Sequence, residues 1–508
     1  MRATAVFAAL LTFAASTAEG TIRASATIDS HAPGVRIEPE IFGQFSEQLG
    51  EGITNGIWVG EDSAIPNIRG YRRDVVEALQ ALHVPVLRWP GGCYADTYHW
   101  RDGIGPRAGR PVTLKRWWGN NEEHGVFGTH EFFNFAELIG AKTFLSINVG
   151  TGTAGEAKDW VEYVSSPSRS TLAQLRRANG REQPWRIDYA GIGNESWGCG
   201  GNLTAEQYAP LLRIFGTFVR QDQGPKIVSV GPSADDYPWT EEMMKSRDKF
   251  DVLSLHYYTL PTGDWSHKGA ATSFGKGEWL ATFAQTWRLD EFIARHSAIM
   301  DKSDPGKKVA LAVDEWGTWY DAAPGSTALR QDNTLRDALV AATNFHIFMR
   351  HADRVRMANI AQMVNVLQSV ILTDGAQMVR TPTYHAFLMY RPFQGASAMP
   401  VQVQSPELTT GANRIPSIDV TAAKADGATY VALVNVDPDE PADVELSLAA
   451  ATRMAISGKL LTAAAMDSRN RFGAAEEVRP VEFHGARWRS GRLQVAMPPK
   501  SVVVLTLK

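Results

Sequence analysis

The sequence predicts an α/β protein: a (β/α)8 TIM barrel followed by a C-terminal antiparallel β-sandwich of the jelly-roll kind. From residue 40 to about residue 392, short apolar runs alternate with amphipathic helical stretches, which is typical of parallel α/β folds. Eight such runs occur there, the number that closes a barrel. After residue 392 the helical periodicity stops, and short alternating runs divided by Gly, Pro and Asp indicate a sandwich.

These patterns divide the chain into four parts. We expect a signal peptide over residues 1–18, an N-terminal strand that joins the sandwich over 19–35, the barrel over 36–392 and the sandwich over 393–508. A cationic start, an apolar stretch too short to span a bilayer and small residues up to Ala18 indicate the signal peptide. A buried N-terminal helix is the alternative. The expected protein is secreted or periplasmic and has no membrane span.

The eight apolar runs are the predicted barrel strands. An open, doubly wound sheet is the rival arrangement, but no Gly-x-Gly-x-x-Gly turn follows the first run. Helices are expected between the runs, for example over 71–82, 204–220 and 333–350, and Thr204 and Gln207 have the spacing of a capping box. The predicted barrel strands cover residues 41–49, 84–90, 142–150, 186–195, 226–231, 251–258, 308–316 and 354–366.

The sandwich strands are predicted from shorter runs of alternating apolar residues. One of them lies at the other end of the chain, which would make the sandwich domain discontinuous in sequence. The predicted strands cover residues 21–29, 418–423, 429–436, 444–448, 478–483, 492–497 and 501–507.

Composition excludes several classes of function. A net charge of -4 and a pI near 6.3, with no cluster of Lys and Arg, argue against nucleic acid as a partner. The His residues lack zinc-ligand spacing, so we expect neither a metal nor a cofactor. The two cysteines, Cys93 and Cys199, form an even pair and are a candidate disulfide in an oxidising compartment.

Polar residues stand at or just beyond the end of nearly every predicted barrel strand. Any one of them could be structural, but together they would converge on one rim, where such barrels carry their active sites. The set consists of Glu47, Arg88, Asn148, Asn194, Glu195, Ser233, His256, Tyr258, Glu315 and Gln362.

Two of these strand ends carry a carboxylate followed by Trp-Gly or Ser-Trp-Gly. Glu195 follows Asn194 and precedes Trp197, in a place where burial would hold an acid protonated near neutral pH. A loop hydrogen bond is the alternative role for Glu195. Glu315 ends the seventh run, so both carboxylates would face one barrel mouth. Two carboxylates are the minimum equipment for cleaving a glycosidic bond.

The predicted loop from Cys93 to Glu131 is long for a compact domain, and such loops are usually functional. Its aromatic side chains could stack on sugar faces or simply hold the loop in place. They are Tyr98, Trp100, Trp117 and Trp118, with His124 among them.

Six ordered motifs carry a resemblance to a known family. They are Phe-Ser-Glu-Gln-Leu-Gly at 45–50, Arg-Trp-Pro-Gly-Gly at 88–92, Tyr-His-Trp-Arg-Asp-Gly-Ile-Gly-Pro at 98–106, Gly-Asn-Glu at 193–195, Val-Asp-Glu-Trp at 313–316 and Ala-Asn-Ile-Ala-Gln at 358–362. From about residue 36 to the C-terminus the chain resembles glycoside hydrolase family 51, the retaining α-L-arabinofuranosidases.

The resemblance implies an exo-acting enzyme that releases terminal α-L-arabinofuranosyl groups from arabinose-containing plant polysaccharides or oligosaccharides. It implies Glu195 as the acid/base and Glu315 as the nucleophile. The remaining candidate substrate contacts are Glu47, Arg88, Cys93, Asn194, Trp197, His256, Tyr258 and Gln362.

One departure and several alternatives remain. Cys93 stands where many members of the family have Asn, so one sugar contact is lost or changed. A β-xylosidase or endo-glucanase of the same clan is the second enzyme hypothesis. A non-catalytic carbohydrate-binding protein is the third, although both glutamates are present. The resemblance also allows a homo-oligomer, and no sequence feature decides that state.

Overall fold

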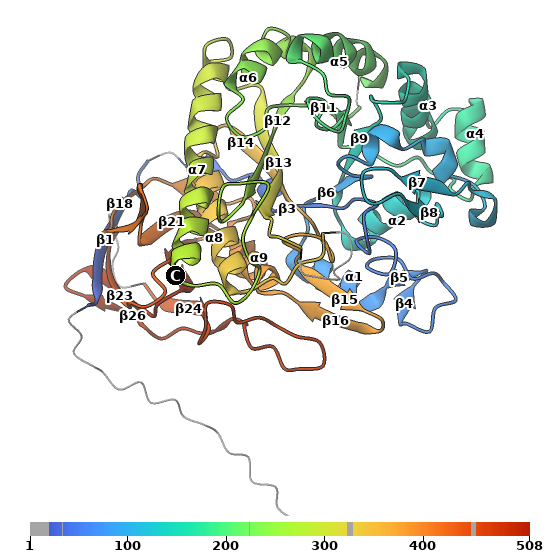
Figure 1. The fold of residues 1–508 in the computed structure, drawn as a ribbon. Coiled ribbons are helices and arrows are strands. Elements are labelled where there is room, and N and C mark those ends of the chain that lie inside the picture. The colour runs from blue at the N-terminus through green and yellow to red at the C-terminus, as the bar shows by residue number, and fades with distance from the viewer. Residues whose placement is uncertain (1–19, 33, 223, 323–328, 449–453) are drawn as a thin grey trace, which may run out of the picture.

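The structure is a computed structural model that describes residues 20–32, 34–222, 224–322, 329–448 and 454–508. It contains a barrel surrounded by helices and a β-sandwich packed against one side of it (Figure 1). The predicted signal peptide over residues 1–18 lies outside the described residues.

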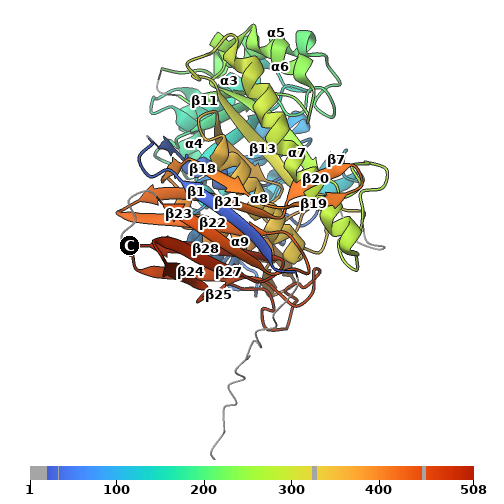
Figure 2. The same cartoon turned by 90° about the vertical axis from the view of Figure 1, so that its left-hand side faces the viewer.

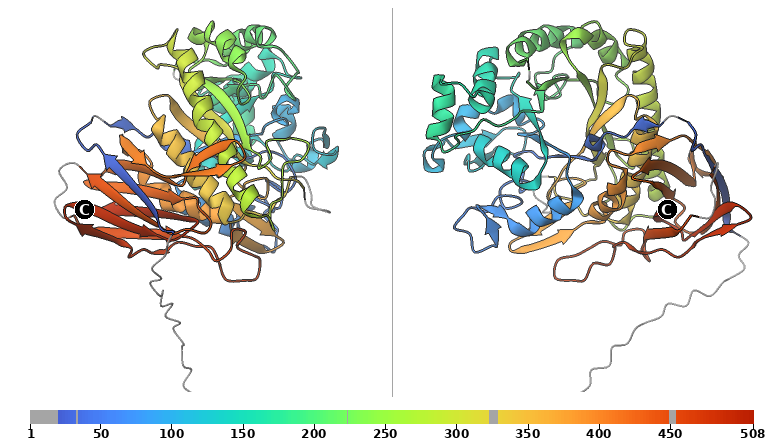
Figure 3. Two further views of the ribbon diagram at one scale, coloured as in Figure 1. Left: turned by 60° about the vertical axis from the view of Figure 1, so that its left-hand side comes forward. Right: turned by 180° about the vertical axis from the view of Figure 1, so that it is seen from behind.

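The barrel is closed, parallel throughout and built from eight strands in the order β10-β11-β12-β13-β14-β3-β6-β9. Each strand begins inside one of the eight predicted runs, so the predicted fold class is confirmed. Figure 3 shows the ring of strands from behind. The strands are β3 (Gly43–Phe45), β6 (Val86–Trp89), β9 (Lys142–Ile147), β10 (Tyr189–Ile192), β11 (Lys226–Ser229), β12 (Val252–Thr259), β13 (Ala310–Thr318) and β14 (Val355–Ile360).

The helices cover the outside of this barrel, and their ends follow local sequence signals. At the start of α5 the Thr204 hydroxyl accepts from the Gln207 backbone N–H, and the Gln207 side chain accepts from the Thr204 N–H, which completes the expected capping box. The helices are α1 (Arg73–Leu82), α2 (Thr129–Ile139), α3 (Ala154–Ser165), α4 (Thr171–Ala178), α5 (Ala205–Val219), α6 (Tyr237–Met244), α7 (Lys276–Asp301), α8 (Leu335–Arg350) and α9 (Pro382–Tyr390).

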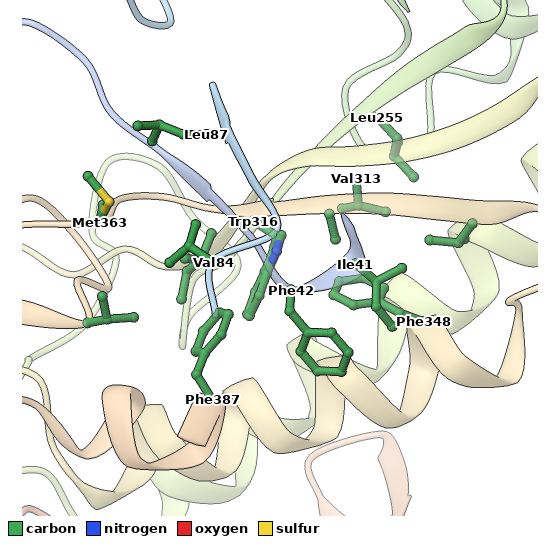
Figure 4. Close-up of a cluster of buried hydrophobic side chains, with 14 of the residues drawn as sticks. Ile41, Phe42, Val84, Leu87, Leu255, Val313, Trp316, Phe348, Met363 and Phe387 are labelled. Atoms are coloured by element: carbon green, nitrogen blue, oxygen red, sulfur yellow. The ribbon is translucent and has the colours of Figure 1, made fainter. Parts of the chain in front are cut away.

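Apolar side chains fill both faces of the barrel wall. Inside, a layer that includes Val86, Phe144 and Met357 closes the barrel below the polar strand ends. Outside, the Trp316 ring stacks on Phe387 at 6.2 Å between centroids, as Figure 4 shows for the packing of strands on helices. Strands buried on both faces read as continuous apolar runs, which is why the sequence revealed them.

The sandwich consists of two sheets. One has the order β2-β17-β21-β22-β28-β24-β25 and the other β18-β1-β23-β27-β26, with β1 parallel to β23 and antiparallel to β18 (Figure 2). The strands are β1 (Ile22–Ile28), β2 (Val35–Arg36), β17 (Ser397–Met399), β18 (Val401–Gln404), β21 (Ile418–Ala425), β22 (Ala428–Asn435), β23 (Ala442–Leu448), β24 (Ile456–Leu461), β25 (Val481–Glu482), β26 (Ala486–Arg489), β27 (Arg492–Met497) and β28 (Ser501–Leu507).

Among the described residues, four small two-stranded sheets complete the sheet structure: β4 (Asn67–Ile68) with β5 (Tyr71–Arg72), β7 (Thr113–Lys115) with β8 (Asn121–Glu123), β15 (Ile371–Asp374) with β16 (Gln377–Arg380), and β19 (Glu407–Thr410) with β20 (Asn413–Pro416). Of these, β7 and β8 lie in the long loop after Cys93, and β19 and β20 pack against α7.

Buried polar contacts fix the sandwich to the barrel. Asp419 of β21 lies 2.9 Å from His346 Nδ1 and accepts from Arg350, both on α8. The indole N–H of Trp279 on α7 donates to the Val436 carbonyl at 2.7 Å. His346, Asp419 and Trp279 are buried, so these contacts hold the sandwich firmly against the helices behind β13 and β14.

Candidate active site

The C-terminal ends of the barrel strands surround one cavity of about 410 Å³. It is a pocket of the size that small ligands occupy. Eight of the ten predicted catalytic and substrate-contact residues line it: Glu47, Cys93, Glu195, Trp197, His256, Tyr258, Glu315 and Gln362. Arg88 and Asn194 lie directly behind this lining, bonded to each other. The two other polar residues at strand ends have different places. Ser233 lines the cavity, whereas the Asn148 side chain forms hydrogen bonds with Tyr98 and Thr151.

Two glutamates meet across this pocket. Oxygens of Glu195, at the end of β10, and Glu315, on β13, lie within 4.8 Å of one another. Retaining glycosidases hold their two carboxyl groups about 5 to 5.5 Å apart, whereas inverting enzymes leave room for a water molecule between them. The separation therefore fits a retaining mechanism.

Hydrogen bonds hold the Glu315 carboxylate in one orientation. Arg88 donates from Nη1 to Oε1 at 2.8 Å, and the Tyr258 hydroxyl donates to Oε2 at 2.7 Å. Arg88 is buried and Tyr258 is half-buried, so water competes weakly for either bond. A carboxylate that accepts hydrogen bonds at both oxygens has a fixed orientation, so its lone pairs point in fixed directions in the cavity, as a nucleophile requires.

Glu195 has a different environment. Burial raises its pKa, the hydrogen bond from His256 lowers it, and the nearby Glu315 charge raises it again. Its backbone is in the left-handed region at φ +41°, and its carbonyl accepts from the N–H groups of Gly198 and Gly200. The tight turn therefore holds a carboxyl group that favours the protonated state at the rim of the pocket.

Glu47 also lines the pocket. It accepts from the Tyr94 backbone N–H at 2.9 Å, the Trp118 indole at 3.3 Å and the Gln362 amide at 3.2 Å. Burial raises its pKa to about 7, although these donors lower it. A Cβ at Gly91 would lie 2.6 Å from the Glu47 side chain, so glycine is needed for this close approach.

A disulfide joins the two loops beside the acid. Cys93 and Cys199 are bonded, with Cα atoms 5.5 Å apart. The Cys199 sulfur contacts Oε2 of Glu195 at 3.6 Å and Nδ2 of Asn194 at 3.8 Å. The bond therefore links the Pro-Gly-Gly loop after β6 to the turn that carries Glu195.

Sequence reasoning missed Asp96. This residue is 2% exposed and accepts from the backbone N–H groups of Val149, Gly150 and Asn194 at 2.8 to 3.0 Å. Burial raises its pKa to about 7, and the three backbone donors lower it. Asp96 ties the ends of β9 and β10 to the long loop, and only its place among aromatic residues in that loop could have drawn attention to it.

Some aromatic residues of the long loop hold the loop in place, and another faces the pocket, where it could stack on a sugar. Tyr98 and Trp100 are buried in the core and hold the loop in place. Trp118 lines the pocket. A further platform was not predicted: Trp319 packs edge-on against Tyr258 at 5.0 Å and Trp265 at 5.3 Å between centroids. Trp265 is 55% exposed, so the pocket mouth carries an exposed aromatic surface.

A closed parallel barrel with two opposed, differently held carboxylates in a pocket at its C-terminal rim defines a retaining glycoside hydrolase. Sequence profiles specify it further. The alpha-L-arabinofuranosidase 1 domain matches residues 78–272, and the alpha-L-arabinofuranosidase C-terminal domain matches residues 314–501. The chain belongs to glycoside hydrolase family 51, the α-L-arabinofuranosidases.

Relatives match over almost the whole chain. An intracellular exo-alpha-L-arabinofuranosidase of Bacteroides ovatus is 45% identical over 98% of both chains. The GH51 arabinofuranosidase structure from Xanthomonas axonopodis pv. citri is 49% identical, with a TM-score of 0.94 over 96% of this chain and 100% of that one. The Thermotoga maritima enzyme, solved as an arabinose complex, is 29% identical with a TM-score of 0.85 over 95% and 99%. The family and the arabinofuranosidase activity are thus confirmed.

The predicted secreted or periplasmic location is wrong by the same comparison, because the relative from Bacteroides ovatus is named intracellular. A cationic start followed by a short apolar stretch satisfies the composition of a signal peptide, but composition alone does not establish export. Within the described ranges, no helix has the length and apolar character needed to cross a bilayer. These relatives give no support to a β-xylosidase or endo-glucanase.

Proposed function

We propose that Glu315 is the nucleophile and Glu195 the acid/base of this exo-α-L-arabinofuranosidase. The observation that carries the proposal is the unequal treatment of two carboxylates whose oxygens lie within 4.8 Å. Glu315 receives charged and hydroxyl donors at both oxygens, whereas burial favours the proton on Glu195. The two environments therefore suit one carboxylate to act as the nucleophile and the other to act as the proton donor.

In the first half-reaction, a Glu315 oxygen attacks the anomeric carbon while Glu195 protonates the departing glycosidic oxygen. The covalent ester neutralises Glu315, which removes a like charge and lowers the pKa of Glu195. In the second half-reaction, ionised Glu195 takes a proton from water as the water attacks the same carbon, and the bond from that carbon to Glu315 breaks to restore the free carboxylate. This step releases arabinose with its original configuration.

The part of the pocket lined by Glu47 and Gln362 would hold the furanosyl ring. Glu47 and Gln362 accept and donate hydrogen bonds suited to sugar hydroxyls, and Asn194 is oriented by Arg88 at the edge of the ring site. The disulfide sulfur of Cys93 replaces an amide with a weakly polar surface. Contact there would therefore be mainly by van der Waals packing.

We propose arabinose-containing plant oligosaccharides as substrates, with a terminal arabinofuranosyl group entering the cavity of about 410 Å³. An intracellular position, as named for the relative from Bacteroides ovatus, would favour short, imported oligosaccharides over intact polysaccharides. A homo-oligomeric state remains a prediction.

The test is azide rescue of Glu195→Ala and Glu315→Ala with an aryl α-L-arabinofuranoside. Glu195→Ala should yield the glycosyl azide with retained configuration, because azide attacks the covalent intermediate. Glu315→Ala should yield the opposite anomer, because azide takes the place of the missing nucleophile. Full activity of either variant would refute the assignment.

A further inference from the structure

His256 on β12 is not available to a sugar through its ring nitrogens. It is 5% exposed, and its Nδ1 lies 2.8 Å from Oε1 of Glu195. Its Nε2 lies 3.2 Å from Oδ1 of Asp314, a residue that sequence reasoning did not single out. Each nitrogen therefore faces a carboxyl oxygen, an arrangement that suits an imidazolium, in which both nitrogens carry a proton.

A local irregularity in β13 creates this arrangement. Neighbouring residues of a regular strand point to opposite faces, so Asp314 and Glu315 of β13 would normally separate. The pairing of β13 with β14 shifts register between Val313 and Trp316, and the pairing of β12 with β13 shifts just before His256. Such bulges re-aim side chains next to active sites. Here they turn two consecutive carboxylates toward the same imidazole.

The charges around His256 balance. The imidazole faces Glu195 from β10 and both Asp314 and Glu315 from β13, with Glu315 Oε2 at 3.6 Å from Nδ1. Arg88 of β6 lies behind Asp314, with its Nε 3.8 Å from Oδ2 of Asp314. Tyr258, which lies on β12 with His256, donates to Glu315. Two cations, Arg88 and imidazolium, thus face two anions, Asp314 and Glu315, when Glu195 carries its proton.

Electrostatic effects support the same protonation state. Burial lowers the pKa of His256, but the carboxylates of Glu315 and Asp314 raise it further, to about 10. The pKa of Asp314 is lowered, because Arg88 and His256 outweigh the effect of its burial. His256 therefore remains an imidazolium throughout the neutral range.

We propose that Asp314 and His256 form a positioning pair for the acid/base: Asp314 fixes the imidazolium, which donates from Nδ1 to Oε1 of Glu195. Oε1 must then act as an acceptor, so the transferable proton resides on Oε2. When that proton has left, the same imidazolium stabilises the Glu195 carboxylate until it acts as base. The inference rests on the proposed role of Glu195.

The test compares His256→Ala, His256→Asn and Asp314→Asn on two arabinofuranosides. One substrate has an alkyl or sugar leaving group that needs protonation, and the other has a dinitrophenyl group that departs without it. Asparagine at position 256 retains a donor near Nδ1 but has no charge, so it separates orientation from electrostatics. Thermal unfolding of each variant verifies the fold.

For the first substrate, we expect His256→Ala to lower kcat/KM by about tenfold to a hundredfold, a part of what general acid catalysis supplies. The basic limb of its pH profile should move up by about 1 to 2 units, because the lost charge-assisted hydrogen bond had lowered the pKa of Glu195. Asp314→Asn should shift the limb in the same direction. Formation of the covalent intermediate from the dinitrophenyl substrate should be nearly unaffected.

His256→Asn should recover part of the rate on the first substrate but retain the shifted limb. Equal losses on both substrates with an unmoved basic limb in folded His256→Ala and Asp314→Asn would overturn the pairing. That result would leave the azide assignment of Glu195 intact. Failure of the azide test in Glu195→Ala and Glu315→Ala would instead remove the proposed roles of the two glutamates.

Discussion

Reduction of the Cys93–Cys199 bond should affect both stability and activity. The two residues are 106 positions apart in sequence. A cross-link across a loop of that length restricts the unfolded chain by about 4.7 kcal/mol in the loop-entropy treatment. For 508 residues unfolding together, at about 2.1 cal/mol/K per residue, this corresponds to a loss of about 4 °C in Tm.

The effect on rate should come from the turn that carries Glu195. Cys199 follows the acid by four positions, and its sulfur contacts Oε2 of Glu195. Backbone bonds from Gly198 and Gly200 remain after reduction, so the turn should loosen and not unfold. A displacement of about 1 Å at a catalytic group can cost a hundredfold in rate, and we expect about tenfold here.

The assay measures Tm and kcat/KM for the parent enzyme and for Cys93→Ser/Cys199→Ser, each with and without dithiothreitol. The reduced parent should match the double variant, and dithiothreitol should leave the double variant unchanged. Thiol titration establishes that the bond has been reduced. Unchanged Tm and rate in a parent enzyme whose two thiols titrate would refute the reasoning.

Three further substitutions test the contacts described above. Tyr258→Phe removes the 2.7 Å hydrogen bond to Glu315. In steady-state assays it should lower kcat about tenfold to a hundredfold, with little change in Tm. An unchanged kcat would contradict the role of this bond in holding the nucleophile. Asp96→Ala leaves three backbone N–H groups without their acceptor. In urea unfolding it should lower the free energy of unfolding by at least about 3 kcal/mol. A decrease below about 1 kcal/mol would contradict the role of Asp96 in tying the strand ends to the long loop. Gly91→Ala places a Cβ 2.6 Å from Glu47 and should raise KM for aryl arabinofuranosides, because the Glu47 side chain must move. A KM equal to that of the parent enzyme would show that Glu47 can move without affecting substrate binding.

The barrel was predictable because its strands are buried on both faces. Each run of apolar residues ends in polar groups, so strand and site were visible together, as at Glu195 and Glu315. The sandwich was harder to read. Strand β24 is interrupted by Gly458 and β26 alternates arginine with tryptophan, so neither gave an apolar alternation. In the predicted run at 478–483, Pro480 leaves only Val481–Glu482 as a strand.

The site was predictable only as far as strand ends reveal it. Asp96 accepts from Val149 and Asn194, which lie 53 and 98 residues away in sequence, so its importance is a property of the tertiary structure. Asp314 would be expected to point away from its neighbour Glu315, and the register shift that reverses this expectation has no short sequence signature.

The placement of β1 imposes an order on biosynthesis. Ile22, the first residue of this strand, pairs with Ala442 in β23. A ribosome that adds about 5 to 20 residues per second needs about 20 to 80 s to make the roughly 420 intervening residues. During that interval the leading segment has no sheet to enter, while the barrel sequence emerges and can collapse. Nascent enzyme must therefore keep this segment from unproductive pairing until translation is nearly complete.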